Sequence, residues 1–205
     1  MTPSTPETND SAISGNCLKP LLANRCGILK QIMKTLVIHP KDDSTDFLSH
    51  IYKDKDFTVV NDNIGNSEKR KLLKNHDRII MLGHGTKDGL FGYKKFMIDS
   101  NDVDTLREKE IVAIWCNADE FVKKYGLKGF YSGMFISEID EAYYEGVYGL
   151  TVEEIEKSNN DFAKILGKHL DSKNTLEKVK LEYKNDDSSI VIFNAQRLYS
   201  SFEND

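Results

Sequence analysis

A histidine and a cysteine stand at the ends of two apolar segments, and their side chains are the ones in this sequence best suited to chemistry. His84 follows the segment RIIMLG, and Cys116 follows the segment EIVAIW. Each segment has the length and the Ile, Val and Leu content of a strand buried on both faces of a sheet. Neighbouring parallel strands lie roughly 5 Å apart, and sites form where such strands end. We therefore expect the thiol and the imidazole to meet as a Cys/His catalytic dyad.

The residues around this pair favour nucleophilic chemistry by the thiol. A neighbouring imidazole can accept the thiol proton and so generate the reactive thiolate. A helix is predicted over residues 118–125, and the unpaired N–H groups at its start would favour a negative sulfur. We therefore expect the pKa of the Cys116 thiol to fall below the ordinary value of about 8.5. Gly85 has no side chain, so its backbone N–H could approach a substrate and, with that of Cys116, stabilise an oxyanion.

Strands and helices alternate along the chain, and this order predicts a sheet that brings the pair together. Strands are expected at residues 35–39, 57–61, 78–83, 111–115, 129–132 and 189–193. Helices are expected at residues 44–52, 67–75, 101–110, 118–125, 137–147 and 175–184. A further helix is expected from Thr151, whose spacing to Glu154 is that of a capping box. Residues 86–100 are expected to form a hairpin or a turn in a surface excursion. The alternation implies parallel pairing with right-handed crossovers. The predicted fold is an α/β, three-layer α/β/α sandwich with a mostly parallel sheet, in which strands 78–83 and 111–115 are neighbours.

Length and charge bound the domain organisation and the partners. The 205 residues suffice for one domain with a sizeable core. Residues 1–32 begin with a stretch rich in Thr, Ser, Pro and Asn, so we expect a disordered or loosely docked extension there and one α/β domain over residues 33–205. The formal net charge of −5 argues against general nucleic-acid binding. No apolar run approaches the ~18 residues that span a bilayer, so no membrane partner is expected.

The cysteines indicate a reducing compartment and a free thiol. Cys17, Cys26 and Cys116 are an odd and sparse set, unlike a disulfide framework. The N-terminus lacks the layout of a secretory signal, so a cytoplasmic location is expected. No His, Cys, Asp or Glu spacing predicts a metal site, and no glycine-rich phosphate-binding pattern predicts a nucleotide. We therefore expect neither a metal nor another cofactor.

The two segments LGHGT and IWCNA, with the βα order before them, resemble the caspase-like cysteine peptidases. This group, often called clan CD, includes the bacterial CHAT domains, and the resemblance covers roughly residues 34–142. It implies a caspase-like fold and a cysteine endopeptidase that acts on a protein or peptide substrate. Carried over residue by residue, Cys116 corresponds to the nucleophile, His84 to the general base or acid, and Gly85 to the contributor to the oxyanion hole.

The resemblance also implies where substrate preference would be set. Members that cleave after Arg or Lys hold the basic side chain with acids in the loop after the first strand and beyond the cysteine. Asp42 stands in the first place, and Asp119 and Glu138 stand in the second. Cleavage after basic residues, with these acids as substrate-binding residues, is therefore expected. One departure is Trp115, which stands where the family has a small residue, and its ring either fills the first specificity pocket or points into the core.

Two other functions remain open from the sequence. A catalytically inactive caspase-like domain could bind a protein partner through Trp115 and the segment at residues 90–97. A flavodoxin-like protein could bind a small molecule at the same edge of the sheet without nucleophilic chemistry. The position of His84 relative to Cys116 separates the peptidase from the small-molecule binder. Only reactivity separates an active peptidase from an inactive caspase-like domain.

Overall fold

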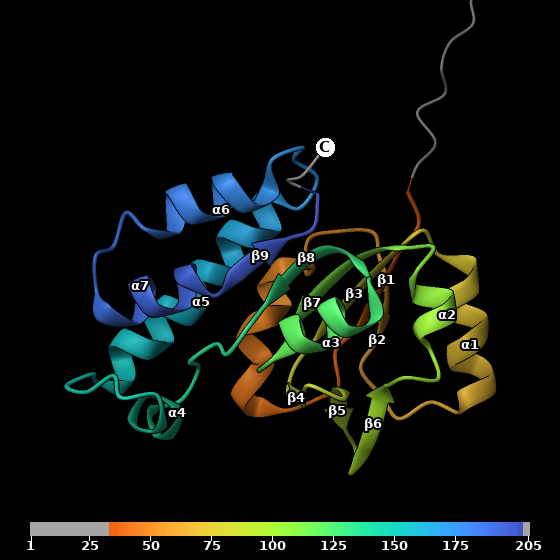
Figure 1. The fold of residues 1–205 in the computed structure, drawn as a ribbon, viewed down its shortest axis with the longest axis horizontal. Helices are drawn as coiled ribbons and strands as arrows, with labels where there is room; N and C mark the ends of the chain where they lie inside the picture. The colour runs from red at the N-terminus through yellow and green to blue at the C-terminus, as the bar shows by residue number, and fades with distance from the viewer. Residues whose placement is uncertain (1–32, 203–205) are drawn as a thin grey trace, which may run out of the picture. The chain divides into compact units, whose positions relative to one another are not determined.

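A computed structural model describes residues 33–202 of the chain, and the extension predicted for residues 1–32 lies outside them. Six strands form one mixed sheet in the order β2-β1-β3-β7-β8-β9 (Figure 1). They are β1 (Thr35–Ile38), β2 (Thr58–Val60), β3 (Arg78–Leu82), β7 (Glu110–Ile114), β8 (Lys128–Ser132) and β9 (Leu198–Ser200). The first five run parallel, and β9 pairs antiparallel with β8. The predicted α/β class and mostly parallel sheet are confirmed.

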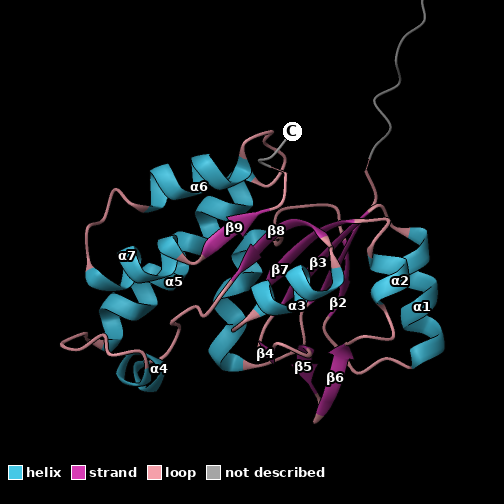
Figure 2. Ribbon diagram, viewed as in Figure 1, coloured by secondary structure: helices cyan, strands magenta, loops and turns pink. Residues whose placement is uncertain are grey.

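Helices cover both faces of this sheet (Figure 2). The face of Ile80 and Leu82 packs against the 3₁₀ helix η1 (Asp43–Ile51), α5 (Val152–His169), α6 (Thr175–Tyr183) and α7 (Ser189–Gln196), with the short α4 (Ile139–Tyr144) at its margin. The face of Ile79 and Met81 packs against α1 (Asn66–Asn75), α2 (Val103–Leu106) and α3 (Ala118–Tyr125). Successive strand residues point to opposite faces, so each central strand contributes to two apolar cores. None of the helices in the described part is long and apolar enough to cross a bilayer.

A second, smaller sheet follows His84 directly. It consists of β4 (Gly85–Thr86), β5 (Gly89–Gly92) and β6 (Lys95–Ile98), all antiparallel. The predicted hairpin within residues 86–100 is therefore confirmed as β5 and β6. The apolar ends Leu90 and Ile98 are fully buried, so the excursion is anchored to the core that lies under α1 and α3.

Several predicted elements differ from the structure. The strand predicted at residues 189–193 is wrong, because this segment lies in helix α7, and the last strand is β9. A short apolar run does not distinguish a buried strand from a buried helix, and the side chain of Asn194 in α7 bonds the backbone of Ile136 in the core. Ser44 and Ser67 do not cap their helices: Asp42 accepts from the Ser44 N–H, and Gly65 precedes α1. The capping box at the start of α5 is confirmed.

A buried ion pair joins α1 to the residue that precedes α2. Lys69 Nζ lies 2.7 Å from Asp102 Oδ2 and donates to the carbonyl of Met97 at 2.9 Å. Both side chains are almost fully buried.

Removing one partner would leave the other charge uncompensated, so Lys69→Met is expected to lower the free energy of unfolding by about 3 kcal/mol or more in urea titrations. Lys41→Met breaks the exposed pair with Asp62 and should leave the free energy of unfolding almost unchanged; a loss equal to that of Lys69→Met would contradict this account.

Candidate catalytic site

The pairing of β3 with β7 places His84 and Cys116 at the same edge of the sheet. Leu82 lies opposite Ile114, and each is followed at the second position by a member of the pair. The Gly83 N–H donates to the Ile114 carbonyl at 3.1 Å and extends the pairing. Leu82 and Ile114 face the core under η1 and α5, so strand alternation turns His84 and Cys116 to that face. Both line one cavity of about 20 Å³. The predicted pairing of the strands β3 and β7 is confirmed.

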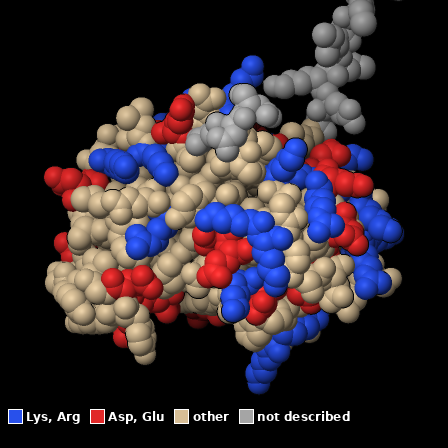
Figure 3. Space-filling view, viewed as in Figure 1, with Lys and Arg blue, Asp and Glu red and all other residues tan. Residues whose placement is uncertain are grey.

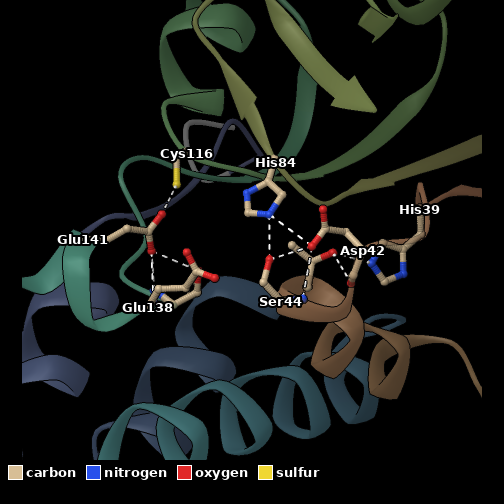
Figure 4. A network of polar contacts seen from close by, with 9 residues as sticks. His39, Asp42, Ser44, His84, Cys116, Glu138 and Glu141 are labelled. Atoms are coloured by element: carbon tan, nitrogen blue, oxygen red, sulfur yellow. Dashed lines mark hydrogen bonds and ion pairs between the residues drawn. The ribbon is translucent and has the colours of Figure 1, made fainter. Parts of the chain in front are cut away.

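Two residues of the loop and helix after β1 hold the imidazole of His84 (Figure 4). His84 Nε2 lies 2.7 Å from Ser44 Oγ and 3.6 Å from Asp42 Oδ1. The Ser44 hydroxyl donates to Asp42 Oδ1 at 2.8 Å, and the Ser44 N–H donates to the same oxygen at 3.1 Å. The hydrogen bond from the Ser44 side chain is the largest influence that lowers the pKa of the Asp42 carboxyl, so Asp42 is an ionised acceptor at neutral pH.

This network determines which nitrogen of neutral His84 carries the proton. A serine hydroxyl has one hydrogen, and Ser44 gives it to Asp42. His84 Nε2 must therefore donate to Ser44 Oγ, which leaves the lone pair on Nδ1. In the view of Figure 4 this second ring nitrogen lies on the side of the imidazole toward Cys116. His84 is thus prepared to accept a proton through Nδ1.

The Cys116 thiol is free, but its polar neighbours are acceptors. Sγ lies 3.6 Å from the Phe135 carbonyl and 3.5 Å from Glu141 Oε1. Burial, and then the negative charge of Glu141, raise the pKa of the thiol to about 12. The expected lowered pKa is wrong for this arrangement, although α3 starts where it was predicted, because the sulfur points to carboxylate and carbonyl oxygens. Among the contacts of the described residues, no hydrogen bond joins His84 to Cys116.

Gly85 makes room for the indole of Trp115. A Cβ at position 85 would lie 2.1 Å from Trp115 Cδ1. The ring is 2% exposed, packs edge-on against Phe121, and donates from Nε1 to the Thr86 carbonyl at 3.0 Å. Of the two expected positions for Trp115, the structure therefore shows the ring in the core. The indole alone accounts for a glycine at position 85, and the oxyanion role of its N–H stays a prediction.

The three acids predicted to bind substrate lie in different places. Asp42 contacts Ser44 and the ring of His84. Glu138 precedes α4 and lines a larger cavity of about 620 Å³ between η1 and α5, which shares Phe47 and Ser137 with the Cys116 cavity. We call this larger cavity the acidic pocket, because its lining includes Asp43, Asp46, Glu138 and Glu156. Asp119 pairs with Lys123 at 2.7 Å and lines neither cavity.

Ser44 and Glu141 are site residues that the sequence interpretation did not include. Ser44 was expected to cap a helix, and its side chain instead joins Asp42 to His84. Glu141 lies in the helix predicted to begin near Ser137, and its position in the sequence indicates no role in the site. The available signals were an Asp-x-Ser pattern after β1 and an acid in the first turn of α4, and neither is specific. Within residues 33–202, no group of three or more His, Cys, Asp or Glu side chains is placed to hold a metal ion.

The state of His84 is directly measurable by the nitrogen-15 shifts of its side chain. Neutral His84 is expected to be the Nε2–H form, and Ser44→Ala should weaken that preference, because Nε2–H loses its acceptor at 2.7 Å and keeps only the more distant Asp42 carboxylate. Ser44→Thr keeps the hydroxyl and should keep the Nε2–H form. Ser49→Ala, also in η1, is the control that should change nothing. Observation of the Nδ1–H form in the unsubstituted protein would contradict the geometry.

Comparison with known proteins adds no second line of argument about the site. No protein-family model matches the chain, and no curated protein sequence is significantly similar to it. The features of this chain that bear on function are therefore the arrangement of His84 and Cys116, the side chains that contact them, and the cavities beside them.

Proposed function

We propose that this chain is a caspase-like cysteine endopeptidase that uses a Cys116/His84 dyad. One observation carries the proposal: the thiol and the imidazole line the same cavity where two adjacent parallel strands end. Ser44 and Asp42 support it, because they leave the Nδ1 lone pair of His84 free to take a proton. The mostly parallel sheet with helices on both faces is compatible with the caspase-like fold that the His-Gly and Cys segments resemble.

The reaction would be acyl transfer through the sulfur. The thiol proton passes to His84 Nδ1, and the Cys116 thiolate attacks the carbonyl carbon of the scissile peptide bond. The carbonyl oxygen becomes an oxyanion, which accepts from the N–H groups of Gly85 and Cys116. His84 then gives its proton to the departing amine, and the acyl group remains on sulfur as a thioester. A water molecule, deprotonated by His84, hydrolyses the thioester and restores the thiol.

Cleavage after basic residues is the substrate preference that we propose. Four carboxylates and one lysine, Lys53, line the acidic pocket beside the dyad, and no ion pair engages any of the four carboxylates among the described residues. Ile139, Val152 and Ile155 supply apolar lining for the alkyl part of a Lys or Arg side chain. Glu138 is the best placed of the three predicted acids. Asp42 acts on His84 instead, and Asp119 could contact only substrate residues outside this pocket.

The proposed substrate is a protein or peptide, and the proposed compartment is the reducing cytoplasm. A nucleophilic thiol needs reducing conditions to stay free. On the face drawn in Figure 3, lysine and arginine side chains are interspersed with acidic side chains. A continuous basic surface of the kind that follows a phosphate backbone is not present on that face. No cofactor enters the proposed reaction.

A second candidate is a catalytically inactive caspase-like domain that binds a protein partner. The high thiol pKa and the small Cys116 cavity favour it, because a protonated and enclosed thiol does not react. Tyr143, Tyr144 and Tyr148 are 59%, 90% and 69% exposed on and after α4, beside the candidate site. Exposed tyrosines are common at protein interfaces.

Peptide cleavage separates the two candidates. The full chain should cleave peptides with Arg or Lys at P1 faster than matched peptides with Asp. Cys116→Ala and His84→Ala should each lower kcat/KM by at least about 100-fold, because the nucleophile or the base is removed. His169→Ala, which only loses a contact to Glu182, is the matched histidine control. Cleavage that survives Cys116→Ala would contradict the assignment, and no cleavage in any assay would favour the binding domain.

The acidic pocket has its own test. Glu138→Gln should lower kcat/KM for an Arg peptide by about fivefold, a loss of about 1 kcal/mol from one partly exposed charge pair. It should leave kcat/KM for a neutral peptide unchanged. Glu153→Gln removes a nearby acid in the first turn of α5 that does not line the pocket, and should affect neither peptide. An equal effect of both substitutions would show that negative charge in general, and not a contact with Glu138, sets the preference for the Arg peptide.

A further inference from the structure

Glu141 uses its two carboxylate oxygens for different purposes. Oε2 accepts from the Ser137 N–H at 2.7 Å, the Ser137 hydroxyl at 3.0 Å and the Glu138 N–H at 3.1 Å, which fixes the start of α4. Oε1 lies 3.5 Å from Cys116 Sγ and accepts from the thiol. One side chain thus joins the position of α4 to the state of the sulfur. Figure 4 shows Glu141 between α4 and Cys116.

The space beside the sulfur is too small for a substrate in this arrangement. The cavity that Cys116 and His84 line measures about 20 Å³, which is room for about one water molecule. Phe135 and Ser137, which lead into α4, form part of its wall. Cys116 is itself half-buried, so withdrawal of this wall and of Glu141 would widen the approach of a peptide carbonyl to Sγ.

The segment that carries Glu141 is held by few buried contacts. Ala142 is the one fully buried residue of α4, and Ile139 packs only partly against the core. The segment before it is anchored, because the side chain of Asn194 bonds both backbone groups of Ile136. After α4, Gly146 and Gly149 have φ of +73° and +79°, a region that other residues rarely adopt. Movement of residues 137–149 would break the bond from Asn159 Nδ2 to the Ser137 carbonyl and uncover Ala142, Ile139 and Val147, but the segment contributes no other residue to the main core.

We propose that Glu141 is a latch that keeps the site latent: it caps the Cys116 thiol while α4 is docked, and withdrawal of α4 frees the thiol and opens the cavity. The inference rests on the proposed function, because it describes the regulation of that same site. The charged and titratable groups around the sulfur are Glu141, Glu145 and His84. The two carboxylates oppose a thiolate, and only Glu141 touches the sulfur.

The charge can be removed without removing the helix cap. Glu141→Gln keeps a side-chain oxygen for the Ser137 and Glu138 N–H groups, since Gln also serves in a capping box, and it presents a neutral amide to the sulfur. Alkylation of Cys116 in the full chain by iodoacetamide, followed by mass spectrometry of its peptide, should become at least about tenfold faster, the change for one unit of thiol pKa. Glu153→Gln removes a carboxylate in the first turn of α5 that lines neither cavity, and should change the rate by less than about twofold.

The outcomes separate the latch from the peptidase. An alkylation rate that Glu141→Gln leaves unchanged, or raises no more than Glu153→Gln does, would overturn the latch, even if the unsubstituted chain cleaves peptides. Faster alkylation without peptide cleavage would support the latch and count against the peptidase. Urea unfolding of each variant shows whether the fold is intact. If Glu141→Gln is destabilised, Glu145→Gln provides a second test, because it removes a charge near the sulfur outside the cap and should raise the rate by a smaller factor.

Discussion

The parallel register of β3 with β7 is the constraint on which the candidate site depends. Leu82 pairs with Ile114, and the residues beyond each strand keep the same alternation, so both reactive side chains turn to one face. A slip of one residue in either strand would turn His84 or Cys116 to the opposite face. The pairing of β1 with β3 adds the loop that carries Asp42 and Ser44. The sheet therefore places His84, Cys116 and the start of the segment that carries Asp42 and Ser44 at one edge.

Two carboxylates act on the two members of the pair in different ways. Asp42, through Ser44, fixes the ring of His84 with Nδ1 unprotonated. Glu141 keeps the proton on Cys116, since a second negative charge beside it is costly in a buried place. His84 can therefore accept a proton through Nδ1, while the Cys116 thiol keeps its own proton. Because Asp42 precedes η1 and Glu141 lies on the small helix α4, a movement of α4 alone would change the surroundings of Cys116 without changing those of His84 Nε2.

The sequence was sufficient for the strands that matter most and for the two residues at their ends. RIIMLG and EIVAIW are long enough, apolar enough and sharply ended, so β3 and β7 were predicted with their order in the sheet. The β-branched residues of the segment SIVIF favour a strand, whereas tertiary packing against α5 and α6 makes it part of α7. The thiol pKa could not be predicted, because Glu141 reaches Cys116 from 25 positions along the chain. Ser44 reaches His84 across 40 positions, for the same reason.

The central claim is that His84 takes the proton of Cys116, and trapping with a peptidyl electrophile tests it most directly. An arginyl chloromethyl ketone should form a thioether at Cys116 in the unsubstituted chain and faster in Glu141→Gln, and mass spectrometry locates the adduct. Adding His84→Ala to Glu141→Gln should slow this reaction by at least about tenfold, because the proton acceptor is gone. An equal rate with and without His84, or an adduct at another residue, would contradict the assignment of the dyad.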